Sequence, residues 1–565
     1  MRVAVYSTVL LFTLSCASPN EAPADLILRG GNIVTMDEAV GNVEALAARD
    51  GVVIAVGTNA EIEALTGPDT QVIDLNGRTA IPGFIEAHAH FTGIGRSLMN
   101  IDLRAARSWD EIVETIGAAA ADREPGEWIL GWGWHQEKWD APPSPAVEGY
   151  PVHDALSAAT PDNPVLLKHA AGSHAGIVNA RVLEIAGIDD ATPNPNGGTI
   201  LRDGDGRATG VLRESAYAIV LAAHADAMAQ LDAAELELLA RREIELANAE
   251  CLKNGVTSFH DAGSSFADVD RFRAMYDEGN IDVRLWVMLN ESNEALADKM
   301  DGYRTIGAAG GRLTVRAIKR SADGALGTHG AWLLEPYEDH DSVGLGTVES
   351  LSETARLARE HGYQLCVHAI GDRANREVLD IYERVLAAHP EQAADARFRI
   401  EHSQHLHPDD VPRFGELGVI AAMQGVHTTS DAPWIPPRLG DERAEWGAYV
   451  WQDLMASGAV VTNGTDAPVE RVDPIASFYS TVTRRDANGD VFYGDQAMSR
   501  EEALRSYTIN NAFAAHEEDI KGSISPGKLA DITILDQDIM TIDEERIKDT
   551  NVLYTIVGGR ILYRR

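Results

Sequence analysis

The sequence predicts an α/β fold: a (β/α)8 barrel that carries a discontinuous β-sandwich built from both ends of the chain. Short apolar segments alternate with helix-like runs through residues 81–515, as such a barrel requires. Residues 25–80 and 516–565 instead consist of strand-like runs joined by turns. Metal-binding residue types follow several apolar segments of the middle region, and active sites are built at that end of barrel strands.

The two flanking regions have the same strand-and-turn character. Apolar runs occur at 26–28, 32–36, 52–57 and 72–75, and again at 532–535, 552–557 and 561–563. Asp-Gly at 50–51 and Asn-Gly at 76–77 are typical of hairpin turns. We therefore expect residues 25–80 and 516–565 to pair in one sandwich.

The middle region predicts helices at 233–253, 351–361 and 375–388. Residues from about 100 to 235 carry an unusual share of Trp, Pro and Gly, and we interpret them as an insertion that covers the active-site mouth. Four tryptophans lie there: Trp128, Trp132, Trp134 and Trp139. They either contact a substrate, with Trp134 as the candidate, or form the insertion's own core, because buried aromatic side chains usually just pack.

Composition excludes some functions. The chain has 565 residues, a hydrophobic fraction of 45% and a formal net charge of −39. These values indicate a globular protein. So negative a chain repels nucleic acid and anionic membrane surfaces, so we expect a small-molecule substrate. The oligomeric state stays open, a homo-oligomer included.

Residues 1–16 resemble an export signal. Arg2 precedes an apolar run at 3–14, and Cys16 follows within a short stretch of small residues. The run is shorter than the ~20 residues that a membrane-spanning helix needs. We expect export to the periplasm, or an outer-membrane lipoprotein anchored through Cys16; a disordered tail or a first strand is the alternative. Because Cys366 should point into the barrel and Cys251 lies in a helical run, we expect no disulfide.

Two histidines mark the first candidate site. His88 and His90 end an apolar segment that follows Pro82 and Gly83. Alternate residues of a strand point to one face, so both imidazoles would lie side by side, as a divalent metal needs. Alone, the pair could also be two surface histidines of an edge strand.

Four more candidate ligands follow in order along the chain. They are Lys319, His368, His402 and Asp466. Each lies at or near the C-terminal end of a short apolar segment and precedes a glycine-containing or polar loop. In a barrel all of these ends meet at one rim, so the pattern predicts a single metal site there.

Several further motifs point the same way. They are Gly-Trp-Gly-Trp at 131–134, Gly-Val-Thr at 255–257, Asp-Gly-Ala-Leu-Gly at 323–327, His-Ala-Ile-Gly-Asp-Arg at 368–373, Met-Gln at 423–424 and Ser-Pro-Gly-Lys-Leu-Ala-Asp at 525–531. With the ligand residues, they make the sequence resemble the amidohydrolase superfamily, and in particular the branch that includes N-substituted formamide deformylase. The resemblance runs from about residue 26 to 565 and does not specify a substrate.

The resemblance implies two divalent metal ions, for which we expect zinc. His88 and His90 would bind one ion and His368 and His402 the other. Lys319 would bridge both ions as a carbamate formed with CO2; the alternative is a lysine paired with a barrel carboxylate.

Asp466 would ligate the first ion, accept the proton of the attacking water and pass it to the leaving nitrogen. Taken alone, it could equally be a turn residue before Ala467 and Pro468. The candidates for substrate contact are His174, Asp323, Gln424, His427 and Trp134. His329 and Gly425 stand where the family commonly has arginine and proline.

These observations favour a metal-dependent hydrolase of a non-peptide carbon–nitrogen bond, in an amide, N-formyl or cyclic amide substrate. The same centre could cleave an ester or a lactone, because one hydroxide attacks either carbonyl. A third hypothesis is a non-catalytic surface protein that binds a ligand. The complete set of six ligand positions argues against that hypothesis.

The N-terminal prediction is testable without a substrate. We expect the mature chain to begin at or just after Cys16 and to lie outside the cytoplasm. Cell fractionation followed by mass spectrometry of the N-terminal peptide measures both. An intact Met1 on cytoplasmic protein would contradict export, whereas a soluble periplasmic form with unmodified Cys16 would contradict lipidation alone.

Overall fold

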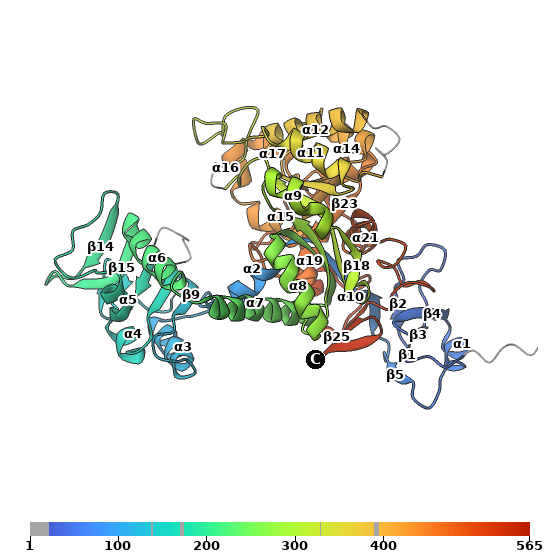
Figure 1. Cartoon of the computed structure of the whole chain (residues 1–565), viewed down its shortest axis with the longest axis horizontal. Helices are drawn as coiled ribbons and strands as arrows, with labels where there is room; N and C mark the ends of the chain where they lie inside the picture. The colour runs from blue at the N-terminus through green and yellow to red at the C-terminus, as the bar shows by residue number, and fades with distance from the viewer. Residues whose placement is uncertain (1–21, 137–138, 170–174, 328, 389–394) are drawn as a thin grey trace, which may run out of the picture.

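The fold is seen in a computed structural model of the chain (Figure 1). It describes residues 22–565 except 137–138, 170–174, 328 and 389–394. Cys16 and the rest of segment 1–16 therefore lie outside the described residues. Within the described ranges, no helix is both long and apolar enough to cross a bilayer.

Eight parallel strands form the barrel, and the predicted (β/α)8 fold is confirmed. In order around the sheet they are β7 (Phe84–Ala89), β16 (Val256–Ser264), β17 (Arg284–Leu289), β19 (Leu313–Ser321), β20 (Gln364–Ala369), β21 (Arg399–His402), β22 (Ile420–Gln424) and β23 (Val461–Gly464). The last strand returns to the first: the Asp466 amide donates to the His88 carbonyl at 2.8 Å. Thr465 also donates to the Glu86 carboxylate from its amide (2.8 Å) and its hydroxyl (2.9 Å). These bonds join the ends of β23 and β7, which carry candidate ligands.

Helices follow the strands and cover the barrel. The main ones are α7 (Ala233–Lys253), α8 (Phe266–Glu278), α9 (Asn293–Tyr303), α11 (Leu351–Glu360), α12 (Asp372–Ala387), α14 (Val411–Leu417), α15 (Gly425–Asp431), α18 (Trp451–Ala456), α19 (Pro474–Thr483), α20 (Arg500–Ser506) and α21 (Ile509–Ala514). The helices expected at 233–253, 351–361 and 375–388 correspond to α7, α11 and α12. Their apolar faces pack with the outer faces of the strands in one large core.

The two chain ends build the predicted sandwich. One sheet has the order β4 (Val52–Gly57), β3 (Ala45–Arg49), β1 (Leu26–Arg29) and β5 (Gln71–Asp74). The other combines β2 (Asn32–Ile33) and β6 (Thr79–Pro82) with β24 (Ile532–Leu535), β25 (Val552–Val557) and β26 (Arg560–Arg564). Buried side chains of both sheets share one core, including Leu28, Leu46, Ile534 and Ile556.

A buried ion pair joins the sandwich to the barrel. Arg284, at the start of β17, donates to both carboxylate oxygens of Asp531 at 2.7 and 2.9 Å. The Asp531 carboxylate also accepts the Gly558 amide at 2.7 Å. Since both charged groups are almost fully buried, each depends on the other for compensation.

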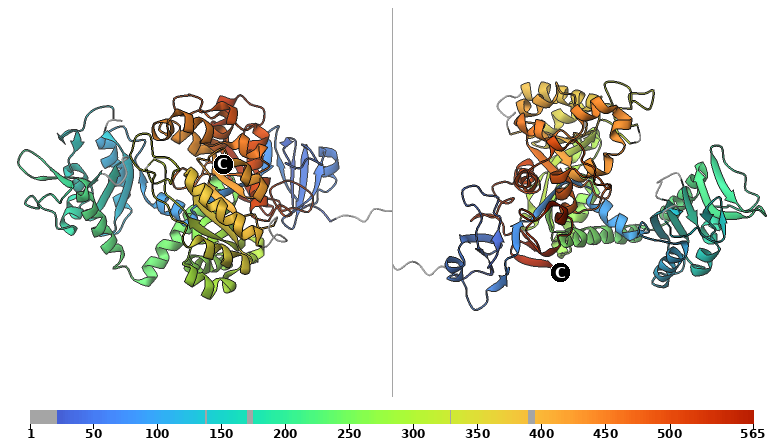
Figure 2. Two further views of the ribbon diagram at one scale, coloured as in Figure 1. Left: turned by 90° about the horizontal axis from the view of Figure 1, so that it is seen from above. Right: turned by 180° about the vertical axis from the view of Figure 1, so that it is seen from behind.

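Residues after β7 form a separate body beside the barrel (Figures 1 and 2). Its sheet has the order β14 (Gly198–Arg202), β15 (Ala208–Glu214), β13 (Ala175–Val178), β12 (Val165–His169), β9 (Ile129–Trp134) and β8 (Ile101–Asp102). Helices α3 (Trp109–Ala121), α4 (Asp154–Ala159), α5 (Ala180–Ile185) and α6 (Ser215–Met228) pack with it. These elements run from β8 to the end of α6, within the stretch of about 100–235 that we interpreted as an insertion.

The insertion is held on a stalk of two helices. Helix α2 (Phe91–Met99) leads into it from β7, and α7 leads back to β16. The helices touch at Gly95, where a Cβ atom would lie only 1.7 Å from the Glu243 carbonyl oxygen. Arg96 of α2 also donates to the Glu243 carboxylate of α7 at 2.8 Å, next to this contact. The stalk thus sets the distance between insertion and barrel.

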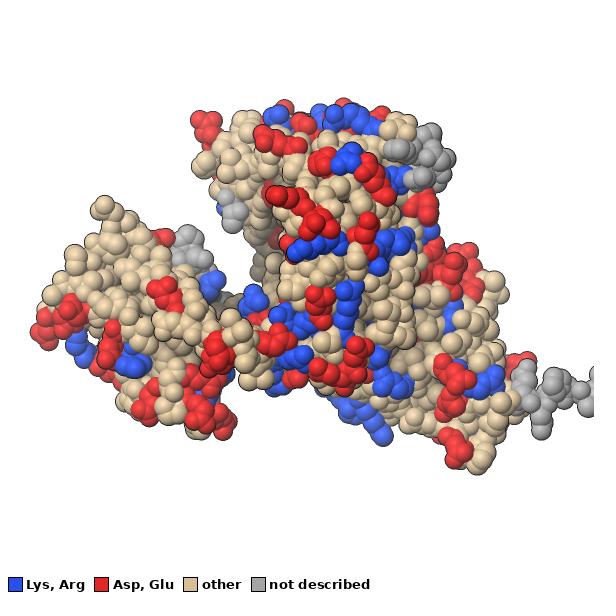
Figure 3. Space-filling view, in the orientation of Figure 1, with Lys and Arg blue, Asp and Glu red and all other residues tan. Residues whose placement is uncertain are grey.

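In the single chain the described residues of the insertion border the mouth and do not cover it. The space-filling view shows open space between the two bodies (Figure 3). Their contact lies at the base, where Arg471 in the loop after Asp466 donates to Asp102 of β8 at 3.0 Å. A cleft of about 400 Å³ lies there, lined by Leu98, Trp132 and Val469 among others. For the part of the insertion that the structure describes, the expectation of a cover fails because the stalk holds the insertion's sheet to one side.

Most of the tryptophans belong to the insertion's core. The Trp134 ring stacks on Trp139 with centroids 6.0 Å apart, and its Nε1 donates to the Leu167 carbonyl at 2.9 Å. Trp128 is partly buried and packs on the sheet's other side against His224. Trp132 is the exception, since it lines the cleft beneath the Arg104 guanidinium. Trp134 is therefore a packing residue and does not contact the barrel centre.

Candidate metal centre

The six predicted ligands lie at the C-terminal rim of the barrel, on five different strand ends. They are His88, His90, Lys319, His368, His402 and Asp466. His88 is fully buried inside β7, whereas the His90 side chain at the start of α2 is 42% exposed. The centre is thus closed from below by the barrel and open towards the mouth.

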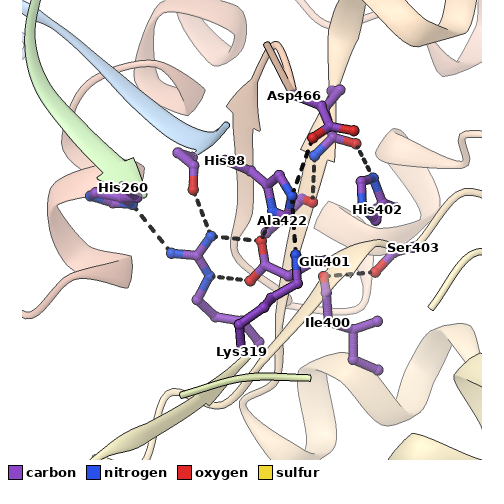
Figure 4. Close-up of polar contacts among 12 residues, drawn as sticks. His88, His260, Lys319, Ile400, Glu401, His402, Ser403, Ala422 and Asp466 are labelled. Atoms are coloured by element: carbon purple, nitrogen blue, oxygen red, sulfur yellow. Dashed lines mark hydrogen bonds and ion pairs between the residues drawn. The ribbon is translucent and has the colours of Figure 1, made fainter. Parts of the chain in front are cut away.

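Asp466 lies between the first two histidines. Its Oδ1 is 3.5 Å from Nε2 of His88 and 3.3 Å from Nε2 of His90. Lys319 approaches from β19, with Nζ 3.3 Å from Nε2 of the same His88 (Figure 4). Lys319 is buried and, within the part of the chain that the structure describes, forms no ion pair with Asp323 or Asp466. The Glu401 and Asp466 carboxylates nevertheless act on its charge, and both raise its pKa against the effect of burial.

The second pair of histidines continues the same cluster. The ring centroids of His368 and His402 are 4.4 Å apart, and those of His402 and His88 are 4.7 Å apart. His402 and Asp466 both have left-handed backbones, with φ of 77° and 54°. Such conformations are unfavourable for residues other than glycine and occur often at functional sites. Here they turn each side chain inward at the end of its strand.

These donors fit a divalent metal ion. Single ligand atoms of His88, His402 and Asp466 lie within 4.8 Å of one another, and all three residues are buried. Nε2 of His368 and Oδ1 of Asp466 are buried and form no hydrogen bond within the described residues. Imidazole and carboxylate ligands suit zinc and similar ions. Buried polar atoms without partners are costly, and a bound ion would remove that cost.

The electrostatics keep these donors in the metal-binding form. Burial, followed by the nearby Lys319 charge, lowers the pKa of His88 to about 4 and that of His368 to about 3. Both imidazoles are therefore neutral at pH 7. Burial would raise the pKa of Asp466, but the neighbouring His90 and the other surrounding histidines hold it well below its ordinary value. Burial also lowers the pKa of Lys319.

A buried charge network supports His88 from behind. Glu401 accepts a hydrogen bond from Nδ1 of His88, and Arg399 donates to both Glu401 oxygens at 2.7 and 2.9 Å. Arg399 also donates to the Ala87 carbonyl at 2.7 Å. Despite burial, which raises it, the pKa of Glu401 is lowered to about 2 by Arg399 and His88. Because Nδ1 carries the proton, Nε2 of His88 keeps its lone pair for the centre.

Sequence reasoning missed Arg399 and Glu401. The signal was present, since Arg399 and Glu401 alternate with the apolar residues Phe398 and Ile400 just before the candidate ligand His402. Alternation puts both on one face of β21, and in a closed barrel a buried charged pair must find partners inside. Their partner, His88, lies far away in sequence on β7.

The predicted substrate residues have mixed positions. Gln424 accepts from Nδ1 of His402 at 2.9 Å and so orients that ligand. Asp323 lies 3.5 Å from Nε2 of His368 and accepts three backbone amides, from Trp332 and residues 370–371, at 2.8–3.0 Å. Both are supports of the centre. His427 lies beside His402, and His174 lies outside the described residues.

Both departures from the family pattern have local partners. His329 pairs with Asp339 through Nε2 at 3.0 Å, on the loop after β19. At Gly425 a Cβ atom would lie 2.0 Å from the Thr481 hydroxyl of α19. The close approach of α19 therefore requires glycine there.

The sequence and the fold are similar to those of known amidohydrolases and metal-dependent hydrolases. The amidohydrolase family profile matches residues 71–563. The Arabidopsis thaliana protein LONG AFTER FAR-RED 3 is 32% identical over 568 residues, covering 97% of this chain and 93% of that protein. N-substituted formamide deformylase of Arthrobacter pascens is 27% identical over 564 residues, covering 96% and 98%. An uncharacterized metal-dependent hydrolase from Pyrococcus furiosus superposes with a TM-score of 0.71 at 27% identity, covering 91% of this chain and 100% of that structure.

The network behind His88 generates a prediction. Glu401→Gln should weaken zinc binding about 10- to 100-fold, the usual effect of losing a charged partner of a metal-bound histidine. Competition with a chromophoric chelator measures the Kd for zinc, and thermal unfolding reports stability.

Loss of Glu401 also leaves the Arg399 charge buried, so stability needs a matched control. Asp531→Asn removes the partner of the buried Arg284 at the sandwich. It should lower the unfolding temperature without changing the Kd for zinc. A wild-type zinc Kd in Glu401→Gln would show that Glu401 does not support the ligand.

Proposed function

The chain belongs to the amidohydrolase family, and from this membership we propose a metal-dependent hydrolase that cleaves a non-peptide carbon–nitrogen bond in a small molecule. The buried cluster of His88, His402 and Asp466 carries the proposal, because it offers a metal ion three donors at one point. The relative from Arthrobacter pascens is named for deformylation of N-substituted formamides. We infer an amide, N-formyl or cyclic amide substrate for this chain.

We infer two metal positions. His88 and His90, with Asp466, would hold one ion, and His368 and His402 would hold the other. When bound, zinc ions lower the pKa of water towards neutrality and polarise a carbonyl group. The open side at His90 gives a substrate access, and the neutral imidazoles below are ready to bind metal without losing protons.

Lys319 fits the position of a bridging ligand only after modification. Its Nζ lies 3.3 Å from Nε2 of His88, so a charged ammonium there would oppose a dication. Attack of the neutral amine on CO2 forms an N–C bond, and loss of the nitrogen proton leaves a carbamate anion. The carbamate offers two oxygen ligands and a negative charge, whereas the unmodified ammonium carries a positive charge. The buried position of Lys319 among the histidines supports this assignment.

Asp466 is the proposed proton carrier. Its carboxylate is ionised, buried and next to both His88 and His90. It accepts a proton from water as the water oxygen attacks the carbonyl carbon. It then donates that proton to the leaving nitrogen as the carbon–nitrogen bond breaks.

Metal content and a substrate screen test this function. Purified protein should hold about two zinc ions per chain, and Lys319→Ala about one or fewer, by plasma mass spectrometry. Metal-replete protein should hydrolyse members of a panel of N-formyl amines, anilides and cyclic amides, and chelation should abolish the activity. Hydrolysis of esters or lactones alone would reject the carbon–nitrogen assignment. Full activity with one ion per chain would reject the second metal position.

The role of Asp466 gives a separate prediction. Asp466→Asn keeps the size and one ligand oxygen of the side chain but removes its basicity. We expect kcat to fall about two to four orders of magnitude, the usual contribution of a positioned general base. Metal content, measured in parallel, should stay near the wild-type value. A variant that keeps its metal and near wild-type kcat would assign the proton transfer to another group.

A further inference from the structure

A second histidine lies beside the ligand His402 without a described role. His427 is in the first turn of α15, directly after β22. Its ring is parallel to that of His402, with an interplanar angle of 7° and centroids 6.4 Å apart. The residue is only 6% exposed. It belongs to the same rim as His402 and Asp466, the ends of the neighbouring strands β21 and β23.

The tautomer of His427 is set by Gln404. Nε2 of the Gln404 amide lies 3.3 Å from Nδ1 of His427. An amide nitrogen can only donate, so Nδ1 must accept and the neutral ring carries its proton on Nε2. The Tyr449 amide donates to the Gln404 carbonyl at 2.8 Å, which fixes the backbone of Gln404. His427 is thereby a fixed N–H donor.

That donor has no acceptor among the described residues. Nε2 of His427 is buried and forms no hydrogen bond with any residue that the structure describes. A buried N–H group without a partner destabilises the fold, so its presence beside the candidate metal centre needs a reason. An oxygen atom of a substrate bound at the rim would supply the missing acceptor.

We propose that Nε2–H of His427 donates a hydrogen bond to the carbonyl oxygen of the bound substrate, and that this bond strengthens as the oxygen gains negative charge. No proton leaves His427; the bond only stabilises charge. The inference rests on the proposed function, because it needs a carbonyl group under attack at the rim. Donors aimed at a developing oxyanion contribute about 10²- to 10³-fold to kcat.

Three variants test the proposal with formanilide as the substrate. His427→Phe keeps an aromatic ring without the donor, and kcat should fall about 10²- to 10³-fold. His427→Gln can place an amide N–H near the position of Nε2 and should stay within about 10-fold of the wild type. His405→Phe is the matched control. His405 is also buried and has no partner for either ring nitrogen among the described residues, but it faces Tyr449, and its loss should leave kcat unchanged.

Binding of acetohydroxamate supplies a readout independent of turnover. Its carbonyl oxygen can bind zinc and accept a hydrogen bond at once. Calorimetry on zinc-loaded protein should show a Kd about 10-fold higher in His427→Phe and nearly unchanged in His427→Gln. Zinc content and unfolding temperature, measured on the same samples, show whether each variant is folded and loaded.

The outcomes separate the two proposals. Wild-type kcat and an unchanged Kd in folded, zinc-loaded His427→Phe would overturn the donor assignment. Equal losses in the Phe and Gln variants would also overturn it, since the effect would then follow the ring and not the N–H group. If the wild type hydrolyses no amide but the Kd pattern holds, the donor assignment stands and the carbon–nitrogen hydrolase proposal fails.

Discussion

The buried Glu401 carboxylate is the interaction on which the centre depends. It joins Arg399 of its own strand to His88 on β7, across the inside of the barrel. Without Arg399, the Glu401 carboxylate would be a buried charge without compensation. Without Glu401, the same would be true of the Arg399 guanidinium. The pair therefore fixes the relative position of two distant strands and the tautomer of a ligand together. Closure of the barrel therefore also sets the tautomer and the orientation of His88.

A second layer of amides extends the same logic. Gln424 accepts a hydrogen bond from Nδ1 of His402, whereas Gln404 donates one to Nδ1 of His427. The two neighbouring imidazoles are therefore held in opposite tautomers. His402 is left with a free Nε2 lone pair and His427 with a free Nε2–H. Two identical side chains are thus prepared as a candidate ligand and a proposed donor, according to which end of an amide each one meets.

The sequence was sufficient for the fold and for the positions of the ligand candidates. Alternating strands and helices, paired terminal strands and polar residues at strand ends are all local patterns, and local patterns can be recognised along one chain. The supporting contacts could not be predicted, because Glu401 meets His88 only after the barrel closes. The placement of the insertion was also misjudged, since the crossing at Gly95 and Glu243 is a tertiary contact. Trp134 shows the limit of composition: an aromatic-rich segment does not say which rings face a ligand and which face each other.

The two-helix stalk has an evolutionary consequence. The chain crosses between barrel and insertion only through α2 and α7, and the buried network behind His88 lies wholly on the barrel side. Substitutions in the insertion's sheet away from Asp102 and Trp132 leave that network untouched. Selection for a new substrate can therefore act on one body while selection to hold metal acts on the other. A lineage can exchange or remodel the insertion and keep an old reaction.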